Sequence, residues 1–296
     1  MLSEPVICSA NINIIPILDC IAPPFTSKIL KYIIESSREL KYIKELLSSS
    51  KSFKPIVFTP LLVNGRPLYS RKGNSRFLEL KSGTTYNARI SFITSNANVS
   101  TYIDELMLLT NRFKTPYGEF HVQVTDIEVV HFSYLHLDFD KYFKIRFITP
   151  VILTNKLMMP PPLKVHSHKV PERHRLIPTP SYIFNYLIRL WNSFVPDDMR
   201  LPKPGSDLWA AYKFGRISDI ILTEVDYSIR PETVIYGKTP TGKPKLIRGF
   251  TGWITYELLY PKLKPIYSKL LALAKYMGIG RSRSIGFGQV EVYAIK

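Results

Sequence analysis

A short run near the C-terminus places two arginines and two serines between glycines, and this combination suits phosphate. The run reads Gly278-Ile279-Gly280-Arg281-Ser282-Arg283-Ser284-Ile285-Gly286-Phe287-Gly288. Glycine permits positive φ and close backbone approach to a ligand, and successive N–H groups in such a turn form an anion-binding concavity. Arginine adds planar donors that match phosphate oxygens. The run 278–288 predicts a phosphate-binding loop, with these binding residues: Gly280, Arg281, Ser282, Arg283, Ser284 and Gly286.

The order of elements around this loop separates it from nucleotide-cofactor loops. A dinucleotide fingerprint has a third glycine at its sixth position and lies between a strand and a helix. Here the sixth position is Arg283, an amphipathic helical pattern precedes the loop, and an alternating strand pattern follows it. The Gly-Lys-Ser/Thr step of a P-loop is also missing from this run. A polymer phosphate is therefore the favoured ligand, and a turn that only permits tight packing remains the alternative.

The net charge indicates a nucleic-acid partner. The 296-residue chain carries +17, of which +4 falls in residues 1–130, +4 in 131–199 and +9 in 200–296. A basic excess clustered around one loop is the electrostatic footprint of a nucleic-acid binder. A basic, solvated surface without a partner is the other interpretation of the same charge.

The remaining composition narrows the class of protein. No apolar run is long enough to span a membrane, and the N-terminal segment lacks the basic region of a signal peptide. Cys8 and Cys20 have no metal-binding or redox spacing, which favours a reduced, cytoplasmic protein. The cluster His166, His168 and His174 lies in a proline-rich loop without acidic or cysteine partners, so we expect no metal site and no cofactor.

The hydrophobic pattern predicts the same order of elements twice. In the first half, strands are expected at 5–18, 53–63, 85–94 and 119–130, with helices at 27–47 (one helix or a broken pair) and 99–111. In the second half, strands are expected at 142–153, 217–229, 245–259 and 287–295, with helices at 181–194 and 265–278. The order β-α-β-β-α-β is that of a ferredoxin-like fold. We therefore expect an α+β protein of two tandem ferredoxin-like domains, 1–133 and 134–296. A single α+β domain with insertions is the alternative.

Several segments resemble one known family. The run 278–293 resembles the C-terminal glycine-rich motif of the repeat-associated RNA-binding superfamily of CRISPR proteins. Within it, the chain is most similar to the endoribonucleases that cut precursor CRISPR RNA. Three further stretches resemble strands and a helix start of that family's second domain: 149–153, 178–184 and 249–254. The family's tandem ferredoxin-like domains agree with the order of elements read from the pattern.

The resemblance implies a mechanism and a partner. Family members cleave RNA without metal: the ribose 2′-OH attacks the adjacent phosphate and leaves 2′,3′-cyclic phosphate and 5′-OH ends. The implied partner is CRISPR repeat RNA, with no membrane partner, and the sequence leaves open an effector complex and a homodimer. Many members use a histidine in the first domain. This chain departs from that pattern, because none of its six histidines lies in residues 1–120.

Lysines are the candidates for the missing histidine's role. Lys28 and Lys31 are one helical turn apart, and Tyr32 is four residues from Lys28. Lys51 follows the helix. A lysine crowded by other cations has a lowered pKa and can move protons as well as hold phosphate. We therefore expect Lys28, Lys31, Lys51 and Tyr32 to be catalytic, although a helical lysine is more often simply solvated.

Further RNA contacts are expected from Lys54, after the first helix, and from Arg230 and Arg248, on strands of the second half. The predicted function is a metal-independent endoribonuclease that produces guide RNAs for antiviral defence. Two alternatives remain: a non-catalytic repeat-RNA-binding subunit of an effector complex, and a general basic RNA-binding module.

Overall fold

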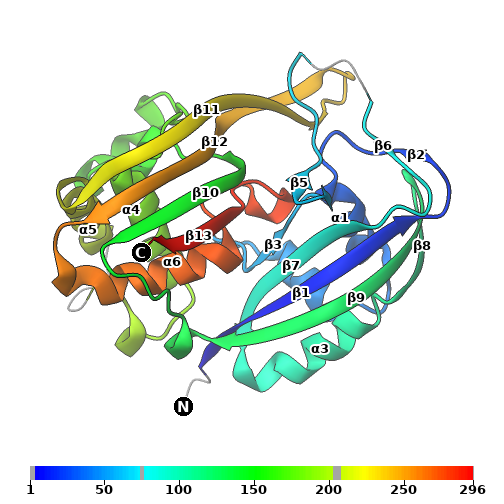
Figure 1. Cartoon of the computed structure of the whole chain (residues 1–296), viewed down its shortest axis with the longest axis horizontal. Helices are drawn as coiled ribbons and strands as arrows, with labels where there is room; N and C mark the ends of the chain where they lie inside the picture. Colours follow the sequence, from blue (N-terminus) through cyan, green and yellow to red (C-terminus); the bar gives the residue numbers. More distant parts are fainter. Residues whose placement is uncertain (1–3, 74–76, 203–207, 296) are drawn as a thin grey trace.

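The protein folds around two large antiparallel sheets, each covered by helices (Figure 1). The structure is a computed structural model that describes residues 4–73, 77–202 and 208–295. The first sheet belongs to residues 5–131 and the second to residues 142–295. The chain is therefore a mixed α/β protein in which each half builds its own sheet.

In the first half, the central strand β1 (Pro5–Pro16) pairs on one side with β7 (Tyr86–Ser95) and on the other with β9 (Gly118–His131). The edges are built from short strands: β3 (Ile56–Phe58), β4 (Leu62–Val63), β5 (Arg66–Pro67) and β8 (Asn111–Thr115). β3 and β4 both pair with β7, and β8 pairs with β9. The three long strands match the sequence expectation, whereas the expected strand at 53–63 is two short ones, and β8 was not expected.

The predicted helix over 27–47 is a broken pair. It consists of α1 (Ser27–Ser36) and α2 (Lys41–Ser48), and a third helix, α3 (Val99–Met107), follows β7. Ile29, Leu30, Ile33 and Ile34 of α1 are fully buried, because positions three and four apart share one helix face. Lys28 and Lys31 lie at the margin of that buried face. This is the part of α1 from which a side chain can reach a ligand.

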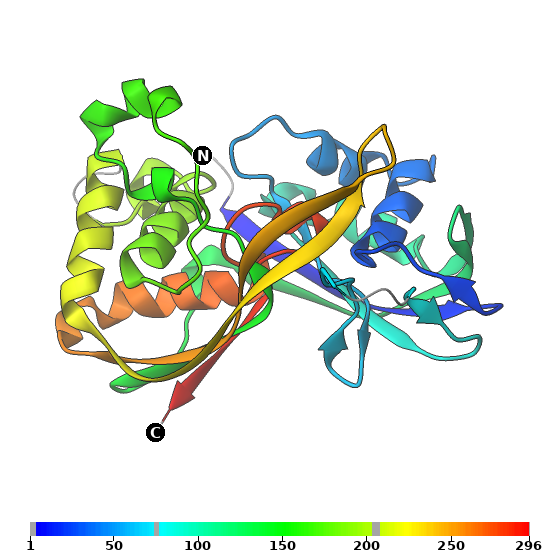
Figure 2. The ribbon, with the colours of Figure 1, turned by 90° about the horizontal axis from the view of Figure 1, so that it is seen from above.

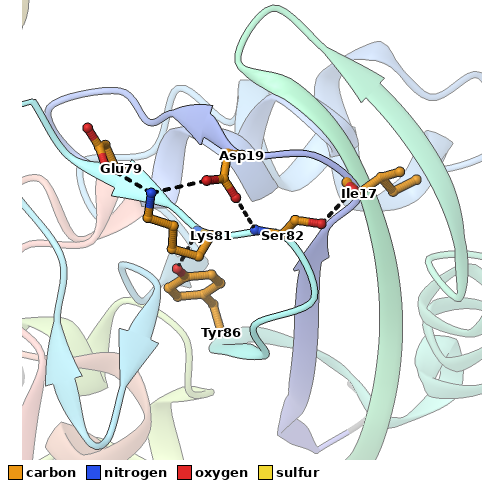
Figure 3. A network of polar contacts seen from close by, with 6 residues as sticks. All are labelled: Ile17, Asp19, Glu79, Lys81, Ser82 and Tyr86. Carbon is orange, nitrogen blue, oxygen red and sulfur yellow. Dashed lines mark hydrogen bonds and ion pairs between the residues drawn. The ribbon is translucent and has the colours of Figure 1, made fainter.

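A small two-stranded sheet closes the outer rim of the first half (Figure 3). It pairs β2 (Cys20–Ile21) with β6 (Glu79–Leu80). Asp19 accepts hydrogen bonds from Lys81 Nζ (3.0 Å) and Ser82 N (2.7 Å). The pKa of Asp19 is lowered, mainly by the Ser82 backbone N–H and then by Lys81, so this network holds the rim through an ionised carboxylate.

In the second half, β10 (Tyr142–Val151) is central between β12 (Pro244–Leu258) and β13 (Val290–Ile295), and β11 (Leu222–Lys238) pairs with β12. The helices are α4 (Pro180–Asn192), α5 (Leu208–Ile221) and α6 (Lys264–Met277). Side chains of α4 and α6 share one core with this sheet. The segment between β10 and α4 forms 3₁₀ turns at Asn155–Met158 and Pro161–Lys169.

Helix α5 was missed, and the strand expected to begin at 217 begins at Leu222. The buried positions of α5 include Ala211, Gly215 and Ser218, which are too small to give an apolar periodicity. Gly215 packs so closely on α4 that an added Cβ would lie 2.8 Å from the Ser181 carbonyl oxygen. The helix is thus specified by close contact between two helices, which a hydrophobic pattern does not record.

The β11–β12 hairpin extends from the second half to the first. Figure 2 shows its far end beside the helices of the first half. Tyr69 donates a 2.9 Å hydrogen bond to the carboxylate of Glu232 on β11, and Arg71 forms an ion pair with the same carboxylate. Lys72 N donates to Thr233 O at 2.9 Å. These contacts fix the hairpin across the junction of the two halves, next to α1.

Candidate functional site

The glycine-rich loop joins α6 to β13, and its two ends are closed by backbone hydrogen bonds. Ile279 N donates to Gly288 O (2.8 Å), Arg281 N to Ile152 O (2.9 Å) and Gly288 N to Pro150 O (3.0 Å). The loop is therefore held against the end of β10 rather than projecting freely. In its centre, Ser282 has a left-handed backbone (φ 62°) and begins a 3₁₀ turn, Arg283–Ile285.

The centre of the loop retains unpaired donors. No hydrogen bond within the described chain uses the backbone N–H groups of Ser282, Arg283 or Ser284. Ser282 is exposed and Ser284 half-buried. A left-handed residue followed by a tight turn is the geometry in which successive N–H groups converge on an anion. The predicted anion site is thus reduced to residues 282–284.

The glycines are required by the protein's own packing. A Cβ at Gly280 would lie 2.6 Å from the Ile152 carbonyl oxygen, and one at Gly286 would lie 2.8 Å from the Phe25 ring. Both residues have positive φ, 94° and 96°. The expectation that these glycines admit RNA is therefore revised: protein atoms already occupy the space beside them, and their absence of a side chain lets the loop dock.

The two loop arginines have different environments. Arg281 is exposed and forms an ion pair with Glu172, with 60% of its side chain accessible. Arg283 is only 5% exposed. Its guanidinium donates to Met277 O (2.7 Å) and Lys54 O (3.3 Å). Arg281 is thus positioned for a solvent-borne ligand, whereas the contacts of Arg283 favour a structural role that joins α6, the loop and the first half.

Helix α1 begins directly against this loop. Ser27 Oγ donates to Ile285 O at 2.7 Å, and the rings of Phe25 and Phe287 stack with centroids 4.4 Å apart. These contacts place the first turn of α1, including Lys28, beside residues 285–287. The glycine-rich loop of the second half and the lysine-bearing helix of the first half therefore meet at one place.

Three lysines gather at the first turn of α1. Lys28 is half-buried, and its Nζ lies 3.1 Å from the Cβ position of Gly237 on β11. Burial lowers the pKa of Lys28, and the positive charges of Lys31 and Lys245 lower it further. Lys31 also forms a 3.4 Å ion pair with Glu35. We call Lys28, Lys31 and Lys245 the lysine cluster.

The other predicted catalytic residues are Tyr32, which directly follows Lys31 on α1, and Lys51, which follows α2. Lys51 is exposed, and its Nζ lies 5.6 Å from the centroid of the Phe194 ring. Tyr32 is exposed. It adds to burial, the main cause, in raising the pKa of Tyr117. Among the described residues, no side-chain hydrogen bond or ion pair joins Lys51 or Tyr32 to the lysine cluster. Lys54 Nζ is occupied by Leu47 O at 2.6 Å, so Lys54 contributes to the segment's own structure.

The β11–β12 hairpin adds basic residues that sequence reasoning missed. Arg230 and Arg248, which were expected to contact RNA, are exposed on β11 and β12. Lys245 was not expected. The signal that could have identified it is the concentration of lysines around the turn at Pro240-Thr241-Gly242, with Lys238, Lys243 and Lys245 in eight residues, on a hairpin whose partner helix carries Lys28.

No histidine belongs to the lysine cluster. His136 forms a 2.8 Å hydrogen bond with Ser268, His131 pairs with Glu4, and His166 and His168 are exposed on the 3₁₀ segment. Within the described residues, no three metal-binding side chains converge. None of the described helices is long and apolar enough to cross a membrane.

The fold is similar to that of solved Cas6 and RAMP protein structures. A Cas6 from Thermus thermophilus has a TM-score of 0.61 at 16% identity, with 99% of this chain and 100% of that chain covered. A protein described as a RAMP protein binding different RNA substrates has a TM-score of 0.56 at 17% identity, with 97% and 99% covered. At these identities the likeness concerns the fold.

Sequence comparison identifies the family. Residues 8–130 match the model of the Cas6 N-terminal domain, and residues 145–290 match that of the CRISPR-associated endoribonuclease Cas6. The chain is 31% identical to CRISPR-associated endoribonuclease Cas6 1 of Saccharolobus solfataricus, over 99% of this chain and 98% of that protein. It is 30% identical to Cas6 2 of the same organism, over 97% and 96%. The chain belongs to the Cas6 family of CRISPR-associated endoribonucleases.

Proposed function

We propose that the protein is a metal-independent endoribonuclease that cuts precursor CRISPR RNA within its repeats, beside the lysine cluster. The observation that carries the proposal is the meeting of Lys28 with the glycine-rich loop, where unpaired N–H groups of residues 282–284 suit a phosphate. Family membership supports RNA cleavage as the activity. The repeated strand order in both halves supports two ferredoxin-like domains with a boundary near residue 133.

The proposed reaction is an internal transesterification. The ribose 2′-OH gives up its proton to solvent, and its oxygen forms a bond to the adjacent phosphorus as the P–O5′ bond breaks, which yields a 2′,3′-cyclic phosphate and a 5′-OH. Negative charge builds on the phosphoryl oxygens and on the leaving 5′-oxygen, and the 5′-oxygen takes up a proton. Groups that match this charge in the transition state lower the barrier more than groups that only bind the ground state.

Lys28 has the environment for this role. Its pKa is lowered by burial and by the neighbouring lysines, so its ammonium group gives up a proton more readily than a solvated lysine. We assign Lys28 to neutralising a phosphoryl oxygen and protonating the leaving oxygen, with Lys31 and Lys245 as flanking charges. Lys51 lies in the segment that follows α2. In the proposal it supplies a second positive charge that contacts the bound RNA.

The partner in this proposal is CRISPR repeat RNA in the cytoplasm. Delivery of the product to an effector complex and a homodimeric state rest on the resemblance alone. Because residues 1–120 contain no histidine, one alternative remains: a subunit that binds repeat RNA without cutting it.

Single-turnover cleavage of a repeat RNA tests the assignment. Lys28→Ala should lower the rate about 10²-fold, the scale of one lost general acid or charge-stabilising group, and Lys51→Ala should do the same. Lys28→Arg should rescue only in part, because arginine retains the charge but does not readily release a proton. RNA affinity should fall far less, since many other cations hold the backbone.

Alanine at His166, His168 and His174 provides the control and should leave the rate nearly unchanged. Loss of cleavage in the histidine variants, with full cleavage in Lys28→Ala, would place the active site elsewhere. Tight repeat binding by the unmodified protein without any cleavage would support the non-catalytic alternative.

A further inference from the structure

A basic pocket adjoins the glycine-rich loop, with Arg281 in its lining. It has a volume of about 260 Å³ and is lined by segments of both halves of the protein. The polar residues of its lining are Ser52, Thr154, Lys156, Glu172, Tyr186, Arg189 and Arg281. We call it the Arg189 pocket. It is separate from the lysine cluster, none of whose members lines it.

Arg189 is the most unusual cation in this lining. It projects from α4, and its guanidinium lies 5.7 Å from the centroid of the Phe53 ring. Burial lowers its pKa, and only the neighbouring Tyr186 opposes that effect. In the part of the chain that the structure describes, no carboxylate forms an ion pair with Arg189. A partly desolvated cation without a counter-charge is costly to keep in the free protein.

Lys164 lies near Arg189, although it does not line the pocket itself. It lies on the 3₁₀ segment Pro161–Lys169. Its pKa is lowered by burial and then by the charge of Arg189, which means that the two cations are close enough to repel each other. An anion bound at Arg189 would offset this repulsion and part of the desolvation cost.

The only carboxylate in the pocket lining is already engaged. Glu172 forms an ion pair with Arg281 of the glycine-rich loop. Three cations, Lys156, Arg189 and Arg281, therefore line the pocket against one acid. An incoming phosphate would compete with Glu172 for Arg281, because a bidentate guanidinium pairs equally well with a carboxylate or a phosphate.

We propose that the Arg189 pocket binds a backbone phosphate of the RNA other than the scissile one. Arg189 is its main ligand, Lys164 supports it, and Arg281 exchanges Glu172 for the phosphate. The identity of the polymer rests on the proposed function. The glycine-rich loop borders both sites: Ile285 faces α1 and Arg281 faces the pocket. Four residues span at most about 14 Å, so the two phosphates would be only a few nucleotides apart.

The test measures binding of a repeat RNA with a single 2′-deoxy nucleotide on the 5′ side of the scissile phosphate, over a range of salt concentrations. Arg189→Met retains the length and the contact with Phe53 but removes the charge. It should lower the affinity roughly tenfold, which corresponds to about 1.4 kcal/mol, and reduce the slope of log K against log salt by about 0.7–0.9. Glu172→Gln should have the opposite effect on affinity, a severalfold increase, because it frees Arg281.

Lys262→Ala is the control for loss of one exposed lysine. Lys262 precedes α6, whose 14 residues separate it from the loop by about 21 Å, so the affinity and the slope should not change. The phosphate itself is located by placing one uncharged methylphosphonate at a time along the RNA. At one non-scissile linkage, the methylphosphonate should weaken binding by the unmodified protein but leave binding by Arg189→Met unchanged.

The proposal would be refuted if Arg189→Met left unchanged both the slope of log K against log salt and the set of linkages at which a methylphosphonate weakens binding. If that variant does not fold, Lys164→Ala and Glu172→Gln decide, and unchanged affinity in both has the same meaning. The readout does not involve cleavage. A protein that shows the predicted binding changes but never cuts would refute the proposed function and leave the pocket in place. Normal cleavage without the predicted binding changes would refute the pocket and leave the proposed function in place.

Discussion

Arg283 and Arg281 are two residues apart in the loop, yet the structure assigns them different consequences on substitution. Arg283 is 5% exposed and donates to Met277 O and Lys54 O. Each hydrogen bond from a charged group contributes about 1.5–3 kcal/mol to stability, and the 3.3 Å bond belongs at the low end. We expect Arg283→Met to lower the free energy of unfolding by about 3 kcal/mol. By the average entropy per residue this corresponds to a melting temperature about 5 °C lower.

Arg281→Met is the matched comparison. Its ion pair with Glu172 is exposed, and such pairs contribute about 0–1 kcal/mol, so its melting temperature should stay close to that of the unmodified protein. Its RNA affinity should fall instead, with a smaller salt slope. Thermal unfolding and salt-dependent RNA binding of both variants check the contrast. An Arg283→Met protein as stable as the unmodified one, with reduced RNA binding, would refute the structural role and restore Arg283 as a phosphate ligand.

Two further predictions concern the loop and the lysine cluster. Gly280→Ala should lower the free energy of unfolding clearly more than Gly242→Ala. Both substitutions place an alanine at positive φ, which costs about 1–2 kcal/mol. Only at position 280 would the new Cβ also meet a backbone atom, at 2.6 Å. Equal losses in urea unfolding would contradict close docking of the loop. For catalysis, protonated Lys28 is the active form, so the single-turnover rate should fall as pH rises through its lowered pKa. Lys245→Ala removes a charge that lowers this pKa and should move the fall to higher pH; an unmoved profile would exclude Lys28 as the titrating group.

Local pattern was sufficient for the elements with a strong apolar stripe. The helix expected at 181–194 is α4, Pro180–Asn192, because the apolar residues Ile183, Leu187, Leu190 and Trp191 recur at helical spacing and are buried. The helix expected to end at Gly278 does end there, since glycine adopts the positive φ that terminates it. Helix α5 escaped because its buried face consists partly of Ala211, Gly215 and Ser218, whose contacts depend on α4 and not on their own hydrophobicity.

The sequence singled out both the glycine-rich loop and the lysines of α1, and the structure brings the two together. The loop's glycines and arginines indicated phosphate, and the lysines of α1 indicated a charged catalytic face. Nothing local distinguishes Arg281 from Arg283, because burial of Arg283 depends on carbonyls at Met277 and Lys54. The approach of Lys245 to Lys28 likewise depends on a long hairpin that crosses to the other half, and sequence distance conceals that contact.

Cleavage of a repeat RNA in excess chelator, with and without one 2′-deoxy nucleotide on the 5′ side of the scissile phosphate, tests the central claim most directly. If the 2′-OH is the nucleophile and the protein's own cations stabilise the charge, the all-ribose RNA is cut in chelator to 2′,3′-cyclic phosphate and 5′-OH ends. The deoxy RNA is bound but remains intact. Cutting of the deoxy RNA, or cleavage that requires added magnesium, would contradict the account.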